Sequence, residues 1–139
     1  MTLVNLGNLI RMMVQRGDQV SGLQLFTSSI GVWVSNVVLF TLVYWQLDRG
    51  GPEARARGRE RRPDWLFPLE SAPAQAVPPG WRPAFVDYLF LGFTTATAFS
   101  PTEALPLTPR ARLLMMGQSA VSLATLVTVA ARAINILGG

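Results

Sequence analysis

Two long stretches without charge dominate this sequence. The first runs from Gln19 to Leu47, and its part Leu23–Leu47 is mostly Leu, Val, Ile, Phe and Trp. A helix over that part would be roughly 37 Å long, which exceeds a hydrocarbon core of about 30 Å. The second stretch runs from Leu113 to Ala131 and is close to the ~20 residues that a span requires. We therefore predict transmembrane helices over residues 19–47 and 108–139.

A buried core helix in a soluble protein is the alternative interpretation of each stretch. Of the 139 residues, 50% are hydrophobic and only 14% are charged, which leaves little polar surface to cover two such helices. The first stretch is also too long for the apolar region of a cleavable signal, and no Ala-x-Ala-like site follows it. We expect an all-α, multi-pass protein of the plasma (cytoplasmic) membrane.

Residues 1–18 precede the first span and have helical periodicity. Apolar residues share one helical face and polar residues another; they are Leu3, Leu6, Ile10 and Met13 against Asn5, Asn8 and Gln15. This pattern predicts either an amphipathic interfacial helix or the stump of a span that begins upstream.

A third apolar segment, within residues 84–107, is too short to cross a bilayer. Its charge-free part lies between Asp87 and Glu103 and would reach roughly 22 Å as a helix. Segments of that length are re-entrant, interfacial or packed against other helices. Pro83 can open a helix here, and Ser100-Pro101 ends it. We predict a half-membrane helix followed by extended chain.

The residue types that are missing exclude most catalytic chemistry. The chain has no His, no Cys and no Lys, so it offers no imidazole base, thiolate, Schiff base or Walker-type lysine. Asp87 and Glu103 flank a helix too long to let them act as an acid and base pair. We therefore predict no enzyme activity, no cofactor and no metal site.

Residues 48–83 are rich in Pro, Gly and charge, which predicts a surface loop without a core. Acidic residues offset many of its arginines and no aromatic residues interleave them, so we predict no nucleic-acid binding. We expect basic and aromatic side chains to meet anionic lipid headgroups, with Tyr44 and Phe67 as further anchors. This predicted lipid interface comprises Trp45, Arg55, Arg57, Arg59, Arg61, Arg62, Trp65 and Trp81. The excess of arginines places the loop in the cytoplasm by the positive-inside rule.

The segment FVDYLFLGFTTATAFSPTEALPLTPRAR, from Phe85 to Arg112, resembles the pore segment of two-helix potassium channels. That family reads Thr-x-Thr-Thr-Val-Gly-Tyr-Gly-Asp, then Pro, Thr and a basic residue that opens the inner helix. The matching positions here are Thr95, Thr97, Glu103, Pro106, Thr108, Pro109 and Arg112. The resemblance covers about residues 81–137, with the preceding span as the outer helix, and implies a tetrameric pore module. It also implies that the loop lies outside the cell, opposite to the arginine count.

The filter positions depart from that family. They read Ala98, Phe99, Ser100, Pro101 and Thr102, so both glycines that permit a ladder of carbonyls toward the ion are absent. Pro101 also favours extended backbone at Ser100. Potassium selectivity therefore does not follow from the resemblance. Glu103 at the pore mouth could attract cations, or it could pair with Arg110 or Arg112 as an ordinary surface charge.

The last helix carries polar side chains at steps of three or four: Gln118, Ser122, Thr125, Thr128, Arg132 and Asn135. Inside a membrane such a stripe faces protein or water, so it lines a conduit or makes interhelical hydrogen bonds. The threonines of the short helix pose the same choice between lining a polar path and bonding their own backbone.

Together these patterns predict an ion-channel-like membrane protein. We expect a homo-oligomer in the lipid bilayer that conducts an inorganic cation without potassium-type selectivity. The alternative is a small, non-conducting membrane scaffold that binds lipid or a protein partner.

Overall fold

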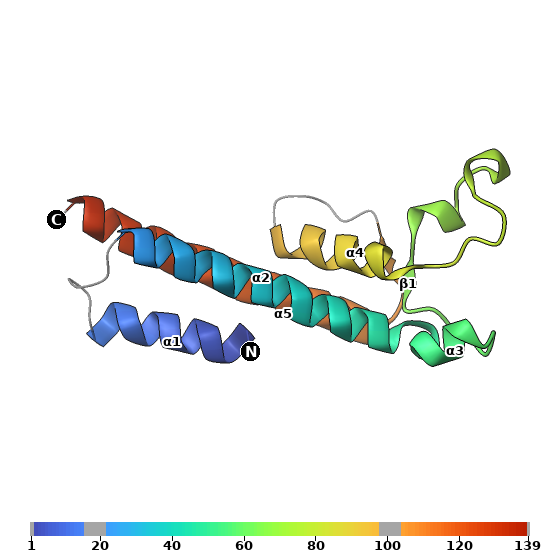
Figure 1. Cartoon of the computed structure of the whole chain (residues 1–139), viewed down its shortest axis with the longest axis horizontal. Coiled ribbons are helices and arrows are strands. Elements are labelled where there is room, and N and C mark those ends of the chain that lie inside the picture. Colours follow the sequence, from blue (N-terminus) through green and yellow to red (C-terminus); the bar gives the residue numbers. More distant parts are fainter. Residues whose placement is uncertain (1, 16–21, 98–103, 139) are drawn as a thin grey trace.

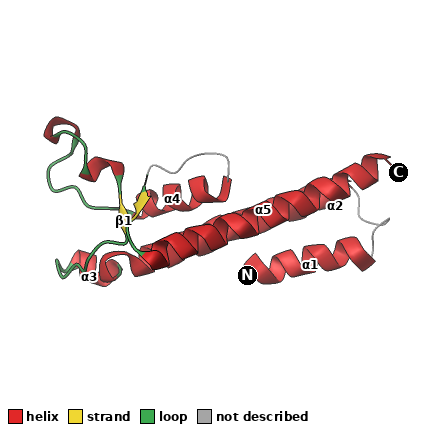
Figure 2. Cartoon of the chain, turned by 180° about the vertical axis from the view of Figure 1, so that it is seen from behind, coloured by secondary structure: helices red, strands yellow, loops and turns green. Residues whose placement is uncertain are grey.

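The computed structural model describes residues 2–15, 22–97 and 104–138. Two long helices, α2 (Gly22–Leu47) and α5 (Pro109–Gly138), lie side by side and form an antiparallel hairpin (Figure 1). Two shorter helices, α1 (Thr2–Gln15) and α4 (Phe85–Thr97), pack beside it. The described chain is mostly helical, as the sequence predicted (Figure 2).

Both long helices are long and apolar enough to cross a membrane. The candidate spans are Gly22–Gly50 and Pro109–Ile136. Only 22% and 17% of their most apolar windows are buried within the chain, whereas a core helix of a soluble protein is mostly buried. Large apolar side chains of both helices, such as Phe26, Leu123 and Ile134, are exposed. This exposure supports a membrane protein.

The loop between α2 and α4 is built from short elements. They are a 3-10 turn (Asp48–Gly50), α3 (Pro52–Ala56), β1 (Trp65–Leu66) and two further 3-10 turns (Pro68–Glu70 and Ala74–Ala76). β1 pairs antiparallel with β2 (Leu105–Pro106), so that Trp65 lies opposite Pro106. The loop is thereby joined to the chain that leads into α5.

Local chemistry sets the ends of the helices. Thr108 caps α5, because its hydroxyl accepts a hydrogen bond from the Ala111 N–H at 3.2 Å. α4 begins similarly, with the Ala84 N–H donating to Asp87 Oδ2 at 2.7 Å. The 3-10 turn that follows α2 ends at Gly51, which has a φ of 101°, and a Cβ there would lie 2.9 Å from the Gln46 carbonyl oxygen. Only glycine fits this turn without strain.

α4 and α5 begin at the same end of the hairpin. α4 starts beside the loop, runs along the hairpin and ends at Thr97 partway down it (Figure 1). The next described residues, Ala104–Pro106, lie back at the end where α4 begins. α1 lies along the other half of the hairpin, where Leu9 packs against Leu25 and Val32.

The main core lies at the loop end. It contains Tyr44 from α2, Tyr88 and Leu91 from α4, and Trp65 and Phe67 from the loop. The expectation that the loop buries no core was therefore wrong. Its aromatic residues enter the core because the charges around them are paired within the chain.

Candidate functional site

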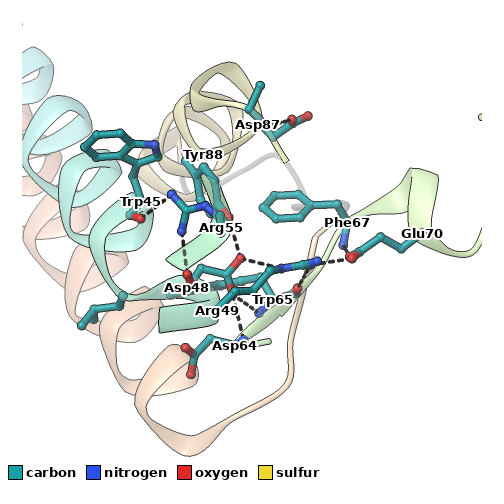
Figure 3. A network of polar contacts seen from close by, with 12 residues as sticks. Trp45, Asp48, Arg49, Arg55, Asp64, Trp65, Phe67, Glu70, Asp87 and Tyr88 are labelled. Atoms are coloured by element: carbon teal, nitrogen blue, oxygen red, sulfur yellow. Dashed lines mark hydrogen bonds and ion pairs between the residues drawn. The ribbon is translucent and has the colours of Figure 1, made fainter. Parts of the chain in front are cut away.

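A network of hydrogen bonds and ion pairs, built around buried charges, closes the loop end of the hairpin, and we call it the cap network. Its members are Asp48, Arg49, Arg55, Asp64, Glu70, Tyr88, Thr108 and Arg110. Fully buried Asp48 lies at its centre (Figure 3). Asp48 Oδ2 accepts hydrogen bonds from Arg49 Nε at 3.1 Å and the Tyr88 hydroxyl at 2.6 Å. Asp48 Oδ1 accepts the backbone N–H groups of Asp64 and Trp65 at 2.8 and 3.3 Å. One carboxylate thus ties the end of α2 to the loop and to α4.

Two buried arginines extend the network in opposite directions. Arg49 forms an ion pair with Glu70 at 2.5 Å and donates to the Trp65 carbonyl at 3.0 Å. Arg55 donates to the Asp48 and Trp45 carbonyls at 2.6 and 2.8 Å. The Arg55 guanidinium also lies 4.9 Å from the centre of the Tyr88 ring, within the range of a cation–π contact. Arg55 therefore caps the last carbonyls of α2 and holds α4 against them.

Asp64 connects the loop to the start of α5. Its carboxylate accepts hydrogen bonds from the Thr108 hydroxyl at 2.5 Å and from Arg110 Nε at 2.9 Å. Burial raises the pKa of Asp64, but the hydrogen bonds from Arg110 and Thr108 and the charge of Arg110 outweigh burial and lower it. The first turn of α5 is thus fixed to β1 through a side chain that stays ionised.

The cap network corrects part of the predicted lipid interface. Four residues expected at the lipid interface are buried within the chain and are not available to lipid headgroups: Tyr44, Arg55, Trp65 and Phe67. Their positions follow from pairing and ring contacts such as Tyr44–Trp65, with ring centres 4.8 Å apart. Of the other predicted residues, Trp45 and Trp81 are half-buried, and Arg57, Arg59, Arg61 and Arg62 are exposed. Arg57 pairs with Glu53 at 3.2 Å.

A second buried polar group lies where α2, α4 and α5 meet. Gln118 of α5 is fully buried, and its Nε2 donates to the Gly92 carbonyl at 2.7 Å. Its Oε1 accepts a hydrogen bond from the Tyr44 hydroxyl at 2.6 Å. Asn36 Nδ2 donates to the Gln118 backbone carbonyl at 3.4 Å. Gln118 therefore links the three helices rather than facing an open space.

The rest of the predicted polar stripe divides by position. Ser122 donates to the Ala96 carbonyl of α4, whereas Thr125 and Thr128 bond carbonyls of α5 itself. Arg132 is half-buried and its Nε has no hydrogen-bond partner among the described residues. Asn135 is exposed. The first members of the stripe thus make interhelical bonds, the second of the two possibilities that the sequence left open.

The described part of the filter-like segment is its helical part. Thr95 is buried and bonds the Leu91 carbonyl at 2.7 Å, and half-buried Thr97 bonds the Thr94 carbonyl at 2.8 Å. These hydroxyls satisfy the backbone of their own helix. Ala98, Phe99, Ser100, Pro101, Thr102 and Glu103 lie outside the described residues. Arg110, one of the two partners considered for Glu103, pairs with Asp64.

Sequence reasoning missed the cap network because its partners are far apart along the chain. Asp48 meets Tyr88 across 40 positions and Asp64 meets Arg110 across 46. Two signals were nevertheless present. Acidic residues are interspersed among the arginines of the loop, and Trp65-Leu66-Phe67 is an apolar triplet within a polar segment.

Comparison with family models, curated proteins and solved structures finds no match to this chain. The described residues also contain no group of three or more His, Cys, Asp or Glu side chains that could hold a metal ion. The resemblance to potassium-channel pores therefore rests on the residues of this chain alone.

Proposed function

We propose that this chain is the subunit of an ion-channel-like membrane protein, with α2 as outer helix, α4 as re-entrant pore helix and α5 as inner helix. The path of α4 is the observation that carries the proposal. α4 enters from the loop end and has 13 residues, or roughly 20 Å, so it reaches only partway along the hairpin. Ala104–Pro106 then lie at the end where α4 began. A short helix whose two flanking segments lie at the same end of the hairpin is consistent with a pore loop and supports the proposal.

The orientation of α4 suits a cation path. A helix carries a partial negative charge at its C-terminal end, and α4 directs that end toward the middle of the hairpin. Within a bilayer, the low dielectric strengthens the attraction between that end and a cation. A homo-oligomer would gather several such helix ends around one axis. If the resemblance to channels extends to assembly, that oligomer is a tetramer. The filter positions lack the glycines of a potassium filter, so the proposed path does not select potassium.

The experiment is conductance of the purified chain in planar bilayers, with native mass spectrometry of the same sample. We expect single-channel currents from an oligomer, with a reversal potential that favours cations in a salt gradient. Glu103→Gln should reduce that preference, and Glu60→Gln in the exposed loop is the matched control. A monomer without conductance would overturn the proposal.

A non-conducting membrane scaffold is the second candidate, and Gln118 and Ser122 favour it. Both side chains bond carbonyls of α4 instead of facing a polar path. In a scaffold, the exposed arginines of the loop would bind anionic lipid or a protein partner. Replacing Arg59, Arg61 and Arg62 with Gln should then weaken binding to anionic vesicles. Unchanged binding would count against this candidate.

The membrane orientation needs its own test, because the arginine count and the channel resemblance disagree. The chain has no cysteine, so a single introduced thiol can be labelled without background. Ser71 is exposed in the loop, and Ser71→Cys should react with an impermeant maleimide on intact cells if the loop is outside. Reaction only after permeabilisation would place the loop in the cytoplasm.

A further inference from the structure

A groove opens between α2 and α5 at the point where α4 ends. It has a volume of about 470 Å³, within the roughly 300–1,000 Å³ of small-molecule sites. Phe26, Ile30 and Trp33 line it from α2, and Leu126 and Val129 line it from α5. No charged side chain lines it among the residues that the structure describes. In a membrane, this groove is open to the hydrocarbon core.

The polar side chains in the groove have no hydrogen to offer to an occupant. Ser29 donates to the Leu25 carbonyl at 2.6 Å and Thr125 donates to the Val121 carbonyl at 2.9 Å. Thr97 donates to the Thr94 carbonyl at 2.8 Å, and Ser122 donates to the Ala96 carbonyl. Each hydroxyl has a single hydrogen, and all four are used within the chain. The groove therefore suits an apolar chain better than water or an ion.

Arg132 adds a charge beside the groove. It lies three residues, or about one turn, beyond Val129 on the same face of α5. From the start of α5 at Pro109 to Arg132 is roughly 34 Å along the helix, which exceeds a hydrocarbon core of about 30 Å, so in a bilayer Arg132 would reach the interface opposite the cap network. Its Nε is buried without a hydrogen-bond partner in the described ranges. A buried guanidinium nitrogen without a hydrogen-bond partner is costly. A phosphate can accept two hydrogen bonds from one guanidinium group.

We propose that this groove holds an acyl chain of an anionic phospholipid whose phosphate pairs with Arg132. The lipid belongs to the leaflet opposite the cap network, because Arg132 lies far along α5 from its start at Pro109, which is beside that network. The site requires that the hairpin lies in a bilayer, but it does not require conduction. Failure of the lipid site would therefore leave the proposed pore function untouched.

Trp33 reports directly on the occupant because it lines the groove. A variant with Trp45→Phe and Trp81→Phe keeps Trp33 and the fully buried Trp65. We would reconstitute the full chain into vesicles of phosphatidylcholine with chain-brominated phosphatidylglycerol, or with brominated phosphatidylcholine at the same fraction. Brominated chains quench tryptophan fluorescence at short range. Greater quenching of Trp33 by the anionic lipid is the expected result.

Three variants and one control variant separate the proposal from its alternatives. Arg132→Gln should remove the excess quenching, and Arg132→Lys should retain part of it because the positive charge remains. Arg112→Gln is the matched control, since Arg112 is exposed at the opposite end of α5. Ser29→Leu, which fills the groove, should lower quenching by both lipids. Circular dichroism of each variant verifies that the helices persist.

Two results would overturn the proposal. Equal quenching by the two lipids, unaffected by Arg132→Gln, would mean that only ordinary surrounding lipid contacts the groove. Absence of quenching by either lipid, together with a crosslink between Trp33→Cys residues of two copies, would mean that a second copy of the chain covers the groove.

Discussion

The hydrogen bond between Tyr44 and Gln118 tests whether the polar side chains of α5 bond to other helices or line a conduit. Tyr44→Phe removes only the hydroxyl, and Gln118→Met keeps the length of the side chain but removes the amide. Interhelical hydrogen bonds in membranes average ~0.6 kcal/mol and reach ~1.7 kcal/mol. Both residues are fully buried and the bond is 2.6 Å long, so we expect a coupling near the upper value. Gln118→Met also removes the bond to Gly92, so this single change should cost about 1–3 kcal/mol.

The assay is a double-mutant cycle measured by unfolding in mixed micelles with increasing sodium dodecyl sulfate. Helical circular dichroism gives the free energy of unfolding for the four proteins. Thr27→Val is the control, because Thr27 is exposed and bonds only its own helix. Coupling below the additivity error of about 0.3–0.5 kcal/mol would refute the reasoning. Gln118 would then be available to line a conduit, as one interpretation of the polar stripe expects.

Three further predictions concern the cap network and the contact between α2 and α4. Asp48→Asn should cost about 3–5 kcal/mol in the same unfolding assay, because it breaks a buried charge cluster. Glu53→Gln, in an exposed ion pair, should leave the free energy of unfolding unchanged. Gly92→Ala places a Cβ against the Thr41 hydroxyl and 3.2 Å from the Val37 carbonyl oxygen, so it should also destabilise, and Thr41→Ala should partly restore stability. The pKa of Asp64 is lower in the folded chain than in the unfolded chain, where it is ~3.9. The contribution of Asp64 to the free energy of unfolding is therefore complete above the unfolded pKa and is lost as the pH falls through the lower folded pKa. The free energy of unfolding should therefore decline as the pH falls below about 3.9, and Arg110→Gln should flatten that decline; an unchanged profile would contradict the role of the Asp64–Arg110 pair.

The helices follow from sequence patterns that act locally. Charge-free length predicts spans over 19–47 and 108–139, and the described helices are 22–47 and 109–138. The end of α4 at Thr97 lies close to Ser100-Pro101, and the start of α5 follows from Thr108-Pro109. Such features depend on residues within a few positions of one another, so a single sequence contains them.

The positions of charged and polar side chains depended on contacts that a sequence does not display. Arg55 and Arg59 belong to the same arginine-rich stretch, yet Arg55 is buried beneath Tyr88 and Arg59 is exposed. Their difference arises from where α4 docks. Likewise Gln118 lies on a periodic polar stripe, but periodicity cannot say whether the facing element is water or the Gly92 carbonyl. These choices required the packing of α4 against the hairpin.

The dependence of α4 on distant partners has a consequence for biogenesis. α2 and α5 are each long enough to enter a bilayer independently, whereas α4 is too short to do so. The hydrogen bond from Tyr88 to Asp48 needs only α2, but the hydrogen bond from Gln118 to Gly92 forms only after α5 is present. We therefore expect insertion in two stages, with the spans entering first and α4 docking last. A chain arrested between these stages would leave the amide of Gln118 without its Gly92 partner inside the bilayer, where an unpaired polar group is costly.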